Sequence, residues 1–83
     1  MYNKLLKASL DKYKAQKSEA IAHLDILFKN SVGIGEHTDI LLEVDKWIKS
    51  LAEADENLEI LGRYFDEYGD LKKGKWNVEY KTN

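Results

Sequence analysis

The sequence predicts an all-α protein: an antiparallel two-helix hairpin with a short extended C-terminal tail, completed by oligomerisation. Three observations predict it. Apolar residues recur at spacings of four and three in two long segments, a period typical of helices that pack along one seam, as in a coiled coil. A short connection with two glycines separates the segments. The 83 residues hold no cysteine, so no disulfide supports a small core.

The first segment predicts a helix over about residues 3–30. Lys17 stands where the apolar pattern expects an apolar side chain, and its alkyl stem can pack while the ammonium reaches water. Leu5, Ile21 and Phe28 widen the stripe, and Asn30 suits a helix end in the left-handed conformation. The residues of the stripe are Leu6, Leu10, Tyr13, Ala20, Leu24 and Leu27.

The second segment predicts a helix over about residues 38–68. Thr38 or Asp39 is expected to cap its start, and Gly69 is placed to end it. Gly62 lies inside, where glycine costs about 1 kcal/mol relative to alanine, so it marks either close packing or a weak spot. The stripe follows spacings of four and three throughout: Ile40, Val44, Trp47, Leu51, Ala54, Leu58, Leu61, Phe65 and Tyr68.

The connection over residues 31–37 is short enough to make the helices antiparallel neighbours. This arrangement predicts a register in which Lys17 comes within reach of Asp55. Phe65 and Tyr68 extend past the first helix, toward Tyr2 and the tail. The pairs expected side by side are Leu24 with Val44, Ile21 with Trp47, Lys17 with Leu51 and Leu10 with Leu58.

Charge is divided between the two halves of the hairpin. Residues 1–30 hold six lysines against three acids, a net charge of +3, and residues 36–70 hold three basic residues against eleven acids, a net charge of −8. Opposite charges favour packing of one segment on the other. We therefore treat residues 1–69 as one hairpin unit and residues 70–83 as a separate tail. Within the tail, Trp76, Val78 and Tyr80 alternate with polar residues as in a strand.

No residues match a catalytic, cofactor-binding or metal-binding motif. Gly33-Ile34-Gly35 precedes a helix, where backbone amides can hold an anion, but we favour a simple chain reversal. Glu36 and His37 are adjacent, so they cannot both face one metal ion, and no third ligand stands at a suitable spacing; His23 is expected on the polar side of its helix.

The acidic residues of the second helix are expected to be solvated. A two-helix hairpin offers no concave site for a small-molecule substrate, so we expect no enzyme activity. No apolar run approaches the roughly 20 residues that cross a bilayer, so we expect no membrane partner. The acids concerned are Glu53, Asp55, Glu56 and Glu59.

Two binding functions remain. We favour a protein-protein interaction module, because aromatic and aliphatic side chains on the helix faces exceed what one partner helix covers. A homo-oligomer, with a dimer preferred, is the first expected partner. Nucleic-acid binding by the lysine-rich tail and first helix is the alternative. The interaction candidates are Trp47, Ile48, Phe65, Tyr68, Tyr2 and Tyr13, and the nucleic-acid candidates are Lys72, Lys73, Lys75 and Trp76.

Residues 28–65 also resemble a family of short helical proteins encoded by tailed bacteriophages. The resemblance is carried by Val-Gly-Ile-Gly-Glu-His at residues 32–37, by the acidic segment 51–61, and by Arg63-Tyr64-Phe65. It implies a phage accessory protein that acts in the bacterial cytoplasm on itself or on a host or phage protein. It supplies no functional residues, and the tail from residue 70 lies outside it.

Overall fold

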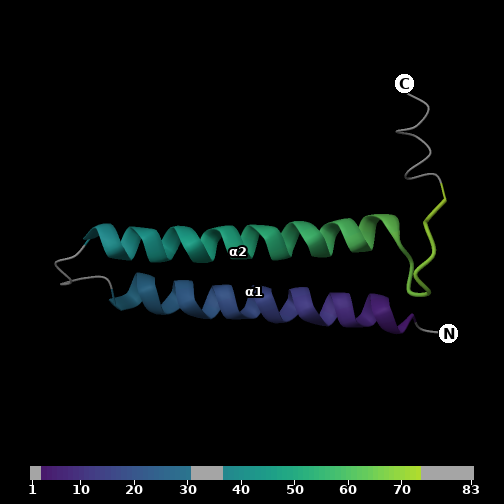
Figure 1. Ribbon diagram of the computed structural model, residues 1–83, viewed down its shortest axis with the longest axis horizontal. Helices are drawn as coiled ribbons and strands as arrows, with labels where there is room; N and C mark the ends of the chain where they lie inside the picture. The colour runs from purple at the N-terminus through teal and green to yellow at the C-terminus, as the bar shows by residue number, and fades with distance from the viewer. Residues whose placement is uncertain (1–2, 31–36, 74–83) are drawn as a thin grey trace, which may run out of the picture.

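The computed structural model describes residues 3–30 and 37–73, and these form the predicted antiparallel helical hairpin (Figure 1). Helix α1 covers Lys4–Asn30 and helix α2 covers His37–Tyr64. The two helices lie side by side as a single layer, so each has one side against its neighbour and the rest of its surface open. Residues 31–36 of the predicted connection and residues 74–83 of the predicted tail lie outside the described residues.

The apolar stripes predicted from the sequence form the seam between α1 and α2. Every stripe position is buried or half-buried except Tyr68, which is half exposed. The buried core is nevertheless small: it consists of Ala20, Leu24 and Ala54 among the described residues. No large side chain in the described part of the chain is fully buried. The contact between α1 and α2 therefore buries little apolar surface completely.

Polar contacts across the seam confirm the antiparallel pairing. The predicted ion pair is present, with Lys17 Nζ 2.9 Å from Asp55 Oδ1. Trp47, which was predicted beside Ile21, stacks on His23, two positions further along α1. The aromatic ring of Trp47 finds a flat partner in the imidazole, whereas Ile21 stays half exposed.

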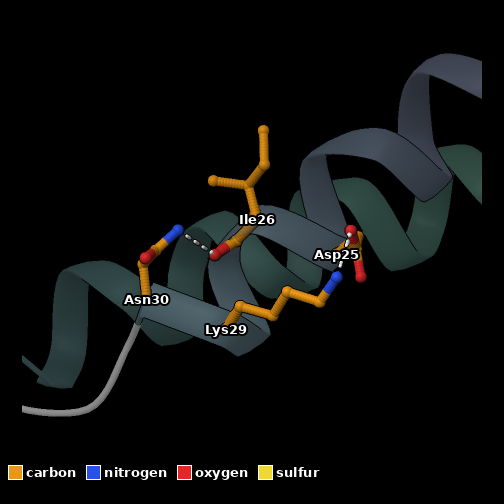
Figure 2. A network of polar contacts seen from close by, with 4 residues as sticks. All are labelled: Asp25, Ile26, Lys29 and Asn30. Carbon is orange, nitrogen blue, oxygen red and sulfur yellow. Dashed lines mark hydrogen bonds and ion pairs between the residues drawn. The ribbon is translucent and has the colours of Figure 1, made fainter.

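The C-terminal end of α1 lies at Asn30, as predicted, but by a different mechanism (Figure 2). No residue other than glycine has a positive φ in the described part of the chain. Instead, Asn30 Nδ2 donates a hydrogen bond of 3.0 Å to the Ile26 carbonyl, which satisfies one of the last helical acceptors. Beside it, Lys29 forms an ion pair with Asp25 at 3.1 Å and places positive charge at the negative end of the helix.

The C-terminal end of α2 differs from the predicted one, whereas its start lies within one residue of the predicted start. The helix begins at His37, so Asp39 lies in its first turn rather than before it. It ends at Tyr64, four residues before the predicted end. The reason is Asp66, whose Oδ1 accepts hydrogen bonds from the backbone amides of Tyr68 at 2.9 Å and Asp70 at 3.0 Å. Such side-chain bonds compete with the helical ladder.

Beyond Tyr64 the chain forms a tight reversal that returns past the end of α2. Phe65 and Leu71 make an isolated antiparallel bridge, and Gly69 takes a φ of 83°. Lys72 Nζ donates to the Gly62 carbonyl at 2.6 Å, which places a cation at the helix C-terminus. Gly69 therefore serves the turn and does not end the helix.

Candidate protein-interaction face

One face of the hairpin carries two rows of exposed apolar side chains. Ile21 and Phe28 lie seven residues apart on α1, and Leu41 and Ile48 lie seven apart on α2, so each pair shares one side of its helix. Their exposed fractions are 48%, 59%, 66% and 44%, respectively. Single exposed apolar residues are ordinary on proteins, whereas a cluster of them marks a binding surface.

The ion pair between Lys17 and Asp55 places both rows on the same face. Lys17 lies four residues before Ile21, and Asp55 lies seven residues after Ile48. Because Lys17 and Asp55 touch at 2.9 Å, the sides of α1 and α2 that carry them meet along one edge of the seam. We call this surface the apolar face and define it by Ile21, Phe28, Leu41 and Ile48.

The opposite face of the hairpin is polar along its middle. Gln16 Nε2 donates hydrogen bonds to the Ser50 carbonyl at 2.9 Å and to Glu53 Oε1 at 3.0 Å. Gln16 and Lys17 are neighbours on α1, but they reach α2 on the two different edges of the seam. The two faces of the single layer therefore differ in chemistry.

The polar face continues toward the connection as a stacked pair of rings. His23 lies seven residues after Gln16, and its ring centroid is 3.9 Å from that of Trp47 with an interplanar angle of 3°. The indole Nε1 donates to Glu43 Oε1 at 3.3 Å. His23 was expected on the polar side of its helix, and there its ring stacks on that of Trp47.

Other exposed apolar residues of the helices do not extend the apolar face. Each is turned from the row on its own helix by roughly 100° or more on the repeat of 3.6 residues per turn. Ile60, for example, lies seven residues after Glu53 and so shares the polar edge of α2. These residues are Leu5, Ile26, Leu42 and Ile60.

Charge borders the apolar face at the end away from the connection. Lys14 continues the α1 row, seven residues before Ile21, and Asp55 continues the α2 row. Glu59, four residues after Asp55, adds a second acid on the same side of α2, where it pairs with Arg63 of its own helix. Both rows therefore end in charge, positive on α1 and negative on α2.

The structure places the predicted interaction residues in different surroundings. Ile48 belongs to the apolar face. Trp47 and Tyr13 are half-buried in the seam, and Phe65 is half-buried at the chain reversal, so the hairpin itself uses much of their surface. Tyr68 is half exposed on the reversal, and its carbonyl accepts a bond from Asn3. Tyr2 lies outside the described residues.

Sequence reasoning missed most of the apolar face. Ile21 and Phe28 were treated as a widening of the stripe, and Leu41 was not singled out. The signal was present in the sequence, because positions 14, 21 and 28 and positions 41, 48 and 55 are two heptad-spaced series. Lys17 and Asp55 were expected to meet, but the two series were not recognised as neighbours on the side of the seam where that pair lies.

The lysines proposed for nucleic-acid contact are only partly described. Lys72 is engaged with the Gly62 carbonyl and Lys73 is exposed, while Lys75 and Trp76 lie outside the described residues. Lysines of α1 are also drawn into pairs with carboxylates of the same chain, as in Lys7 with Asp11 at 2.8 Å. Such pairs reduce the positive field that a phosphate backbone requires.

A shallow hollow of about 230 Å³ lies where the chain reversal meets α1. Its lining contains no acidic or basic side chain. The lining residues are Asn3, Leu5, Leu6, Ser9, Leu61, Phe65 and Gly69.

No helix among residues 3–30 and 37–73 is long and apolar enough to cross a membrane. In the same residues, no three His, Cys, Asp or Glu side chains are grouped so as to hold a metal ion. No family model, no curated protein and no solved structure matches the chain.

Proposed function

We propose that this protein is a non-enzymatic interaction module that binds another polypeptide through the apolar face of its hairpin. The observation that carries the proposal is the gathering of Ile21, Phe28, Leu41 and Ile48 on one face of a hairpin with only three buried residues in its described part. Large apolar side chains are therefore exposed on that face and not buried between the two helices.

Burial of this face favours association. Full burial of an aliphatic or aromatic side chain contributes about 1.5–3 kcal/mol, so removing the remaining half of each surface from water contributes on the order of 1 kcal/mol per residue. Four such residues in one patch form an apolar centre, and the charges at its end form a polar rim. This arrangement is that of a protein interface.

The resemblance of residues 28–65 to short helical phage proteins supports a cellular setting for this module. On that basis we propose an accessory protein of the bacterial cytoplasm. Such a role requires selective contact with another polypeptide, which an exposed apolar patch bordered by charge supplies.

The test compares two matched lysine substitutions on α2. Ile48→Lys puts a charge in the apolar face, whereas Ile60→Lys puts the same charge on the polar edge at a site of similar exposure. Tagged chains are purified from the bacterial cytoplasm, and bound polypeptides, including untagged copies of the chain, are identified by mass spectrometry.

We expect one polypeptide to accompany the unsubstituted chain and Ile60→Lys and to be lost with Ile48→Lys. Circular dichroism must show equal helix content in both variants. Absence of any bound polypeptide, or equal binding by the two variants, would contradict the proposal.

A further inference from the structure

We propose that the polypeptide bound by the apolar face is a second copy of this chain, packed with both connections at the same end, so that α1 of one copy lies over α2 of the other. This inference rests on the proposed function and names its partner. The product is a four-helix bundle in which each apolar face covers the other.

The shape of the hairpin suits this partner. A chain of 83 residues buries only about 60–65% of the surface that its unfolded form exposes, and the seam between α1 and α2 fully covers no large side chain in the described residues. A second layer placed on the apolar face turns two half-exposed rows into a core between four helices. Small domains without disulfides commonly gain stability in this way.

Charge selects between the two symmetric ways to stack the faces. A two-fold axis across the helices places α1 over α1 and α2 over α2, whereas an axis along the helices places α1 over α2. Residues 4–30 hold six lysines against three acids, a net charge of +3, and residues 37–64 hold three basic residues against seven acids, a net charge of −4. Like charges oppose each other in the first arrangement and unlike charges attract in the second.

The ends of the apolar rows make this choice specific. With α1 over α2 and the connections together, the partner's α2 runs along α1 in the same register as the chain's own α2. Lys14 then faces Glu59 of the partner subunit, and the symmetric contact repeats once. Within one chain Glu59 pairs with Arg63 on its own helix, so changing it leaves the contacts across the hairpin seam in place.

The test is a charge swap between two variants, K14E and E59K. Alone, each variant places like charges together at both symmetric contacts, and we expect its dimer dissociation constant to rise roughly tenfold, the order expected for two reversed surface pairs. An equimolar mixture restores unlike charge at both contacts of a mixed dimer. Sedimentation equilibrium measures the affinities, and energy transfer between differently labelled variants reports the mixed dimer.

The outcomes separate this inference from the proposed function. A mixed dimer with the affinity of the unsubstituted chain supports it, provided that circular dichroism shows intact helices in both variants. A dimer that the mixture does not restore overturns the arrangement. A chain that stays monomeric at millimolar concentration, while Ile48→Lys still abolishes capture of a different protein, overturns the second copy as partner and leaves the proposed function standing. If Ile48→Lys weakens neither the dimer nor the capture of another protein, both this inference and the proposed function are overturned.

Discussion

The Lys17 ammonium lies 2.9 Å from the Asp55 carboxylate across the two helices, and this contact places the apolar rows of α1 and α2 on one face. Lys17 occupies a position where the stripe of α1 otherwise carries apolar residues. Its stem stays in the half-buried seam while its charge reaches the acid at the edge. Lys17, the polar residue within the stripe, therefore makes one of the contacts that hold α1 and α2 in register.

Removal of the charges of Lys17 and Asp55 is expected to cost little stability. Their side chains keep 43% and 60% of their exposure, and exposed pairs contribute roughly 0.2–1 kcal/mol. Lys17→Met retains the stem and Asp55→Asn retains the shape, so a double-mutant cycle isolates the charge pair. We expect chemical denaturation at low salt to give a coupling energy of roughly 0.2–1 kcal/mol between the two charges. At about 1 M salt, where the screening length is about 3 Å, we expect a smaller coupling energy.

All variants in this cycle must be measured at one protein concentration, because association would add to the apparent stability. No coupling at low salt would show that the ion pair reports the register without supporting it.

Gly62 and Gly69 are expected to respond in opposite directions to alanine. An added Cβ at Gly62 meets nothing within 4 Å, so Gly62→Ala should stabilise the exposed helix position by about 0.5–1 kcal/mol. At Gly69 the φ of 83° disfavours a side chain, and the Cβ would lie 2.6 Å from Asn3 Nδ2. Gly69→Ala should therefore destabilise the fold by about 1–2 kcal/mol from the backbone conformation alone.

Thermal unfolding separates the two glycines, since about 1 kcal/mol moves the midpoint of a small domain by roughly 4–8 °C. Each alanine variant serves as the control for the other. A fall in the midpoint for Gly62→Ala would indicate that the close packing considered from the sequence exists after all.

Much of the hairpin follows from the apolar period. Positions such as Leu24 and Ala54 are buried where the spacing predicts, because residues at alternating spacings of four and three lie on one side of a helix and face its neighbour. The end of α2 escaped prediction because Asp66 forms side-chain bonds to the backbone two and four residues ahead. Its sequence is compatible with either a helix or a turn, and only the returning chain decides between them.

The candidate site was harder to predict than the fold. Trp47 was expected to present its ring for binding, but the ring stacks on His23 of α1. Ile48, one residue later on α2, faces the other side of the layer and stays exposed. The apolar period locates the seam of a hairpin. The position of the apolar face depends in addition on which side chains of α1 and α2 meet at each edge of the seam.

Asp11 is expected to titrate below its ordinary pKa. A hydrogen bond from Lys7 Nζ to Asp11 Oδ2, 2.8 Å long, lowers the pKa of this carboxyl from 3.8, and the charges of Lys7 and Lys14 lower it further. A folded-state pKa below the unfolded one adds stability that is present above the unfolded pKa. That contribution is lost as the pH falls through the folded pKa.

The contribution of Asp11 is therefore constant between about pH 5 and pH 8 and disappears only in acid. NMR titration of the Asp11 carboxyl should give a midpoint below 3.8, and Lys7→Gln should raise that midpoint. An unchanged midpoint in Lys7→Gln would assign the lowered pKa to a different group.

Asn3 is expected to join the start of α1 to the chain reversal through two separable bonds. Its Oδ1 accepts from the Leu6 amide at 2.9 Å, the geometry of a helix N-cap, and its Nδ2 donates to the Tyr68 carbonyl at 3.3 Å. Asn3→Ala removes both bonds and should cost about 1–2 kcal/mol. Asn3→Asp keeps a capping oxygen but loses the donor, so we expect an intermediate loss of stability.

Hydrogen exchange at the Leu6 amide separates the two bonds. The exchange should stay slow in Asn3→Asp and become faster in Asn3→Ala. Equal exchange in the two variants would mean that Asn3 does not cap α1.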